Sequence, residues 1–199
     1  MPYRKPIQQR AIETEQRFLD ALEQLLRQQS FEDTSIEAIA ERALSTKAAF
    51  LQRFGSKEGA LFVLFSIYAD EASRTMTSVL DRVNRATPLI SFFEEISSEF
   101  DALLQKHFSA NRAMNEYVKR RLESHDMTKK IFGECIEMMV AIQRHYFFDV
   151  YTLEGAKSAA QLLVSLNFHY NMGAMPALPA ESQQRHALLA ELLELAIKR

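Results

Sequence analysis

The sequence lacks the residues and segments that several classes of protein require. A single cysteine, Cys135, excludes an intramolecular disulfide and a thiolate zinc cluster, and we expect it to be a small buried apolar side chain. Few glycines and prolines argue against long disordered segments. No run reaches the roughly 18 apolar residues of a membrane span, and residues 1–10 lack the apolar core of a signal peptide. We therefore expect a folded, cytoplasmic protein without a membrane partner.

Catalytic motifs are missing as well. The chain has no H-E-x-x-H, no G-x-S-x-G and no glycine-rich phosphate loop. Its histidines are scattered along the chain, at His107, His125, His145, His169 and His186. The sequence therefore predicts no enzyme, no catalytic residue, no metal site and no cofactor.

The formal net charge of −2 is unevenly distributed. Residues 1–57 contain 9 basic and 8 acidic side chains, whereas the remainder contains 15 basic and 18 acidic ones. The asymmetry is a weak indication of nucleic-acid binding, because phosphate binding depends on local clusters of positive charge and not on the total.

The apolar residues recur with a helical period nearly everywhere, which predicts an all-α fold. The breaks in this period delimit roughly nine helices. Thr34-Ser35-Ile36-Glu37 has the pattern of a capping box, in which the Thr34 hydroxyl and the Glu37 carboxylate satisfy free amides at a helix start, so a helix is expected to begin at Ser35. Further breaks are predicted at 44–46, 54–56, 87–88, 124–126, 153–155 and 175–179.

Residues 35–54 have the spacing of a helix-turn-helix, SIEAIAERALSTKAAFLQRF. The apolar joint is expected to be formed by Ile36, Ile39, Ala40, Ala43 and Phe50. Thr46 is placed to cap the second helix, whose first turn can reach base edges while its ends meet phosphates. Residues 46–57 contain three bases and no acid. The predicted DNA-binding residues are Thr34, Ser35, Thr46, Lys47, Ala48, Ala49, Gln52, Arg53 and Lys57, with Lys47 on a base and Lys57 on phosphate.

The first 58 or so residues resemble the amino-terminal domain of TetR-family transcriptional regulators. The likeness is carried by Phe18, Ala21, Leu22, Phe31, Thr34, Ser35, Ile36, Ile39, Ala40, Ala43, Lys47, Phe50 and the segment FGSKEGAL at 54–61. The resemblance implies a helix-turn-helix DNA-binding domain at 1–56 and an effector-binding and dimerisation domain at 57–199. It also implies a homodimeric regulator, expected to be a repressor, that binds a palindromic operator in double-stranded DNA.

Four residues depart from the family pattern. Leu44 stands where the family usually has Gly, which costs roughly 1 kcal/mol if the turn requires a positive φ. Ser45 replaces an apolar residue, and Leu51 and Gln52 replace a Tyr and a frequent His. These departures leave open an alternative, a TetR-like helical interaction protein that has lost operator binding.

The aromatic and methionine side chains after residue 57 suit either a packed core or a pocket for an apolar ligand. The resemblance implies a small, largely apolar effector bound among the helices that follow the helix-turn-helix. The predicted lining residues are Phe62, Phe65, Tyr68, Phe92, Phe93, Phe100, Met114, Tyr117, Met138, Met139 and His145.

The last two predicted helices spread apolar residues over more than one face, so they need packing partners on two sides. The resemblance implies that they pair with their copies in a four-helix bundle. The predicted dimerisation residues are Leu162, Leu163, Leu166, Leu188, Leu189, Leu192 and Leu193. The alternative is a monomer in which these helices are simply buried.

Overall fold

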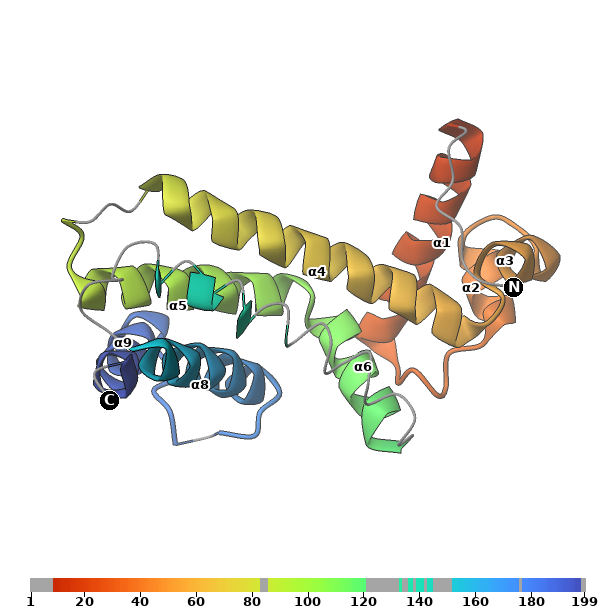
Figure 1. Cartoon of the computed structure of the whole chain (residues 1–199). Coiled ribbons are helices and arrows are strands. Elements are labelled where there is room, and N and C mark those ends of the chain that lie inside the picture. Colours follow the sequence, from red (N-terminus) through yellow and green to blue (C-terminus); the bar gives the residue numbers. More distant parts are fainter. Residues whose placement is uncertain are drawn as a thin grey trace. The chain divides into compact units, whose positions relative to one another are not determined.

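The computed structural model describes residues 9–82, 86–120, 133, 136–137, 139–141, 143–144, 152–175 and 177–197. The protein is all-α: these ranges contain no strand, and residues 133–144 are helical wherever they are described. The helices, shown in Figure 1, are α1 (Gln9–Gln28), α2 (Ile36–Arg42), α3 (Lys47–Phe54), α4 (Lys57–Arg82), α5 (Leu89–Lys106), α6 (Phe108–Arg120), α8 (Leu153–Asn171) and α9 (Ser182–Ile197).

Most of the predicted helix boundaries in the described ranges are confirmed, and two are not. No break was predicted at His107, where α5 ends before α6 begins. The break predicted at 153–155 is the first turn of α8, which Thr152 caps by accepting a hydrogen bond from the Gly155 N–H at 3.0 Å. Gly155 is not a helix breaker: a Cβ there would lie 2.2 Å from the Ile197 carbonyl oxygen, so the glycine permits α8 and α9 to approach closely. The break predicted at 124–126 lies outside the described residues.

The contacts divide the chain into two compact units, with boundaries inside α4 after Tyr68 and near the start of α6 after Phe108. The first unit contains α1 to α3, the beginning of α4, and α6. The second contains the rest of α4, α5, α8 and α9. The division predicted after residue 56 concerns function and stays a prediction.

In the first unit, α6 is joined to the carboxyl end of α1. The Arg112 guanidinium donates to the Leu26 carbonyl and, at 3.2 Å, to the Gln29 carbonyl. The Tyr117 ring stands edge-on to Phe31 at 6.0 Å and to Phe62 at 5.5 Å between ring centroids. Cations are favourable at a helix carboxyl end because its last carbonyls have no partner within the helix.

In the second unit, α5, α8 and α9 pack against one another (Figure 1). A buried ion pair between Asp101 and Arg185 lies among them. Asp101 of α5 accepts from Arg185 of α9 at 2.6 Å and from Asn171 of α8 at 2.7 Å. Arg185 also donates to the Tyr170 hydroxyl at 2.9 Å, and its guanidinium lies over the Tyr170 ring. One carboxylate therefore ties three helices together.

Candidate DNA interface

The turn between α2 and α3 closes on a left-handed residue. The Ser45 N–H donates to the Ala40 carbonyl at 2.9 Å and the Leu44 N–H donates to the Glu41 carbonyl at 3.0 Å. This pair of bonds is a Schellman motif, which places Leu44 at the position that glycine usually occupies. Leu44 has φ +52° and is 87% exposed, so no packing contact offsets the strain. The turn thus keeps the positive φ that the family's glycine accommodates.

Leu44→Gly is expected to raise the free energy of unfolding by about 0.5–1 kcal/mol. Relief of the left-handed strain, about 1–2 kcal/mol, is partly offset by the larger conformational freedom of glycine in the unfolded chain. Leu44→Ala is the matched control, because alanine keeps the Cβ that causes the strain. Chemical denaturation measures both variants, and equal stability of Gly and Ala at this position would contradict the interpretation.

Both short helices have side-chain caps. Thr46 accepts from the Ala49 N–H at 3.1 Å, which confirms the predicted cap of α3. Ser35 caps α2 by accepting from the Ala38 N–H at 3.0 Å, whereas the prediction gave this role to the hydroxyl of Thr34. Thr34 is 1% exposed and donates to the Ser30 carbonyl, so its predicted place among the DNA-binding residues is corrected. Its hydroxyl orders the loop between α1 and α2.

One side of α3 is exposed, and the other holds the helix in place. The exposed side, which we call the reading face, consists of Thr46, Lys47, Ala48, Leu51 and Gln52, with Ala49 and Arg53 half-buried beside it. The buried side packs on α1 through a cluster of three rings. Phe18 stands edge-on to Phe50 at 5.4 Å and to Phe54 at 6.0 Å between ring centroids. The cluster anchors α3 on α1 with its exposed side outward.

The three cations predicted to meet DNA have partners in the unbound protein. Lys47 Nζ lies 2.5 Å from Glu37 Oε1, and Arg53 Nε lies 3.8 Å from the buried Glu15 carboxylate. Lys57 Nζ donates to the Phe31 carbonyl at 2.7 Å and to the Thr34 carbonyl at 2.8 Å. It also lies 4.4 Å from the centroid of the Phe31 ring. Lys57, which was predicted to bind phosphate, therefore donates to carbonyls of the loop between α1 and α2 in the unbound protein.

A groove of about 470 Å³ runs along the reading face between α1 and α3. Its lining brings Arg10 and Thr14 of α1 beside Gln52 and Arg53 of α3. Thr14 was not predicted, since a threonine within an amphipathic helix carries no signal of its own in the sequence. The groove extends the polar surface that faces outward from α3.

The predicted effector residues fall into both compact units. Met138 and His145 lie outside the described residues. Phe62, half-buried, and the buried Phe65, Tyr68, Met114 and Tyr117 belong to the first unit. The buried residues Phe92, Phe93, Phe100 and Met139 belong to the second. Within each unit these side chains make core contacts, such as Phe92 with Phe93 at 5.4 Å between ring centroids.

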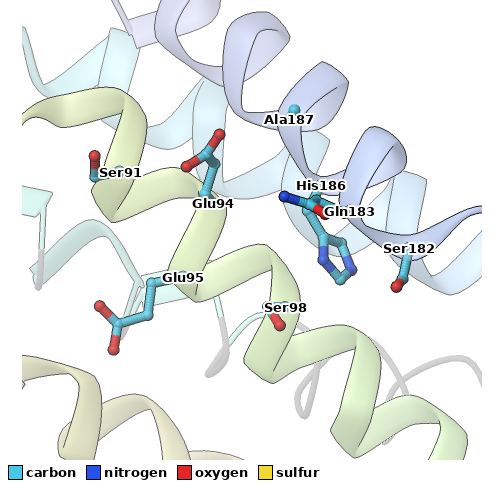
Figure 2. A pocket seen from close by; sticks show the side chains of 8 residues that line it. All are labelled: Ser91, Glu94, Glu95, Ser98, Ser182, Gln183, His186 and Ala187. Atoms are coloured by element: carbon cyan, nitrogen blue, oxygen red, sulfur yellow. The ribbon is translucent and has the colours of Figure 1, made fainter.

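A polar groove of about 480 Å³ lies between α5 and α9 in the second unit (Figure 2). His186 extends from α9 toward α5, with its Nε2 3.2 Å from Asp101 Oδ2. None of the lining residues was predicted to contact an effector. They are Ser91, Glu94, Glu95, Ser98, Ser182, Gln183, His186 and Ala187.

The predicted dimerisation residues divide into two groups by exposure. Leu163, Leu189 and Leu193 are fully buried within one chain, so their assignment to a dimer contact is corrected. They fill the core between α8 and α9. The outward side of these helices instead exposes Leu162, Leu192 and Leu195, with Leu195 exposed to 66%. Leu166 and Leu188 are half-buried.

Two properties of the described residues concern membranes and metal ions. No helix in the described ranges has the length and apolar character required to cross a membrane. No group of three or more His, Cys, Asp or Glu side chains in this part of the chain is arranged to hold a metal ion.

Comparisons with known proteins agree with this geometry. Residues 18–62 match the model of bacterial regulatory proteins of the tetR family. A putative TetR-family regulator from Mesorhizobium loti superposes with a TM-score of 0.74 at 15% identity, covering 94% of this chain and 98% of the other. No curated protein matches the sequence.

Two further solved structures have names that describe a function. The TetR-family repressor AlkX from Dietzia sp., implicated in biodegradation of n-alkanes, has a TM-score of 0.58 at 14% identity, covering 92% of this chain and 94% of the other. The fatty acid degradation regulator FadR from Bacillus halodurans has a TM-score of 0.65 at 14% identity, covering 95% and 96%.

The family match covers the helices that present the reading face, and the likeness to solved structures extends over the remaining fold. Residues 18–62 therefore form the amino-terminal domain of bacterial regulatory proteins of the tetR family, and the chain has the fold of solved TetR-family regulators.

Proposed function

We propose that the protein is a cytoplasmic homodimeric repressor, without catalytic activity, that reads a palindromic operator through α3 and whose operator affinity is controlled by a small, largely apolar effector. The proposal that α3 reads the operator is supported by the exposed reading face. Thr46, Lys47, Ala48 and Gln52 are exposed on a helix whose opposite side is anchored by Phe18, Phe50 and Phe54. The first turn of such a helix can reach base edges in a major groove.

The exposed leucines of α8 and α9 support the homodimer. Leu162, Leu192 and Leu195, with Leu166 and Leu188, have helical spacing on the outward side of the two helices. Burial of such a surface against a second copy removes apolar area from water. A twofold axis would present two copies of α3 to the two halves of a palindrome.

The names of two structural neighbours support the effector and the repressor role. AlkX is described as a repressor implicated in biodegradation of n-alkanes, and FadR as a fatty acid degradation regulator. An apolar effector agrees with the aromatic and methionine side chains, including Phe65, Phe100 and Met114, that fill the helical units. The effector would act by favouring one of two orientations of α4.

The test uses duplexes that the wild-type protein selects from a random-sequence pool. We expect two chains per selected duplex and an affinity that falls on the order of 10³-fold or more between 50 and 200 mM salt. Lys47→Ala is expected to lower the affinity by about 1–3 kcal/mol per reading head and to change the selected sequence, because Lys47 is placed to reach a base.

The matched control is Lys157→Ala, since Lys157 is an exposed lysine of α8 and belongs to the other compact unit. It should leave both the affinity and the selected sequence unchanged. Weak binding to all duplexes with little dependence on salt would reject operator reading and would indicate a helical interaction protein instead.

A further inference from the structure

We propose that Glu37 makes Lys47 a sequence-discriminating residue: its carboxylate cancels the attraction of Lys47 to phosphate and leaves N–H donors of the ammonium for a base. The inference rests on the proposed reading face and concerns Glu37 of α2, which is not among the predicted DNA-binding residues. It predicts that an acid at this interface lowers binding to arbitrary DNA more than binding to the operator.

The pair joins the two helices of the helix-turn-helix. Glu37 lies in the first turn of α2, and Lys47 is the first residue of α3. Lys47 Nζ and Glu37 Oε1 are 2.5 Å apart, and the two side chains are 54% and 63% exposed. Both groups are therefore accessible at the edge of the reading face, and a DNA backbone approaching α3 meets a carboxylate together with the ammonium.

The surroundings of the pair favour its formation. A cation in the first turn of a helix is disfavoured by the helix dipole, and a nearby carboxylate offsets this repulsion. The hydrogen bond from Lys47 lowers the pKa of Glu37 below its usual value, so the carboxylate is ionised at neutral pH. In the unbound protein, an anion thus already occupies a place beside Lys47 that a phosphate oxygen would take.

The two kinds of DNA contact respond differently to this carboxylate. Affinity for arbitrary DNA comes almost entirely from neutralising phosphates and releasing their counterions, and a neutral pair releases few. A base contact is a directional hydrogen bond. The lysine ammonium has three donors, so one can stay on Glu37 while the others reach the O6 and N7 acceptors of a guanine. Glu37 therefore weakens the phosphate contribution of Lys47 and preserves its contribution to sequence reading.

The experiment compares Glu37→Gln with Glu41→Gln on a mixed-sequence duplex and on a duplex selected by the wild-type protein. Glu41 is an exposed acid of the same helix, so both variants remove one negative charge from α2. Exposed ion pairs contribute little to stability, so both variants should fold. Binding is measured over a series of salt concentrations, and Glu37→Gln is repeated in a Lys47→Met background to form a double-mutant cycle.

On the mixed-sequence duplex, Glu37→Gln is expected to raise the affinity about five-fold per reading head at 0.15 M salt. The slope of log K against log salt should steepen by about 0.9 per head, as for one added phosphate contact. The gain on the selected duplex should be smaller, so the ratio of the two affinities falls. In the Lys47→Met background, Glu37→Gln should no longer change the slope.

Three results would overturn the inference while leaving operator reading intact. The first is a Glu37→Gln variant that behaves as Glu41→Gln does, and the second is a Glu37→Gln effect that persists undiminished in the Lys47→Met background. Equal gains on both duplexes would show that the acid tunes affinity without tuning specificity, which also contradicts the proposal. A wild-type protein without salt-dependent binding to any duplex would overturn operator reading itself.

Discussion

Replacing Asp101 with Leu is expected to lower the free energy of unfolding by about 3–5 kcal/mol, because the change leaves the Arg185 guanidinium buried without its carboxylate. Both partners are 2% exposed, and Arg185 Nη2 lies 2.6 Å from Asp101 Oδ2. Domains commonly have only about 5–15 kcal/mol of stability in total. The variant should therefore unfold at a much lower denaturant concentration than the wild type.

The control for this prediction is the double variant Asp101→Leu with Arg185→Met. Replacing both charged partners with apolar side chains removes the buried unpaired charge, so the double variant should be more stable than Asp101→Leu alone. Urea unfolding of the wild type, both single variants and the double variant completes the cycle. Losses that add without any coupling would show that the ion pair does not hold α5 and α9 together.

The same carboxylate gives the stability a dependence on pH. Burial raises the pKa of Asp101, but the hydrogen bonds from Asn171 and Arg185 and the Arg185 charge outweigh burial, and the net pKa is lowered from its ordinary value of 3.8. A group with a lowered pKa in the folded state stabilises the fold above its unfolded pKa. The contribution of Asp101 to stability is lost as the pH falls below 3.8 and through the pKa of Asp101 in the folded protein. Variants without Asp101 should therefore lose less stability in acid than the wild type does.

The helix-turn-helix could be predicted from sequence because its determinants are local. Phe50 and Phe54 are four residues apart on α3, Thr46 precedes the helix it caps, and the apolar joint of Ile39, Ala40 and Ala43 follows a helical period. Each of these signals needs no knowledge of the rest of the chain. The exposed position of Lys47 and Gln52 follows from the same periodicity.

The errors arose where a side chain finds its partner at a distance in the sequence. Asp101 and Arg185 are 84 residues apart, so no local pattern in the sequence indicates that they pair. Leu163, Leu189 and Leu193 have the composition of an interface, yet the packing of α8 on α9 already buries them. Apolar character predicts that a leucine needs a partner and does not tell whether the partner lies in the same chain.

Lys57 also finds its contacts at a distance, on carbonyls that lie 23 to 26 residues earlier in the chain, and its predicted contact with DNA stays a prediction. A lysine at the start of a helix beside a helix-turn-helix indicates a phosphate contact when only the neighbouring residues are known. The structure shows an ammonium held by the Phe31 and Thr34 carbonyls and by the face of the Phe31 ring. The two interpretations make opposite predictions for the same variant.

Lys57→Met is expected to destabilise the first unit by about 2–4 kcal/mol. Hydrogen bonds to a charged donor contribute about 1.5–3 kcal/mol, and the cation–ring contact adds about 0.5–1 kcal/mol. Thermal unfolding measures the overall loss. Hydrogen exchange at the amides of residues 29–35 should accelerate, because the loop loses the donor that joins its carbonyls.

The salt dependence of DNA binding distinguishes this role of Lys57 from a phosphate contact. If Lys57 holds the loop, Lys57→Met leaves the slope of log K against log salt unchanged, apart from any loss of folded protein. If it binds phosphate, the slope becomes less steep by about 0.9 per reading head while the stability stays the same. Lys157→Met is the matched control, since Lys157 is exposed on α8 and should change neither quantity. A less steep slope of log K against log salt, with unchanged hydrogen exchange at the amides of residues 29–35, would show that Lys57 contacts DNA.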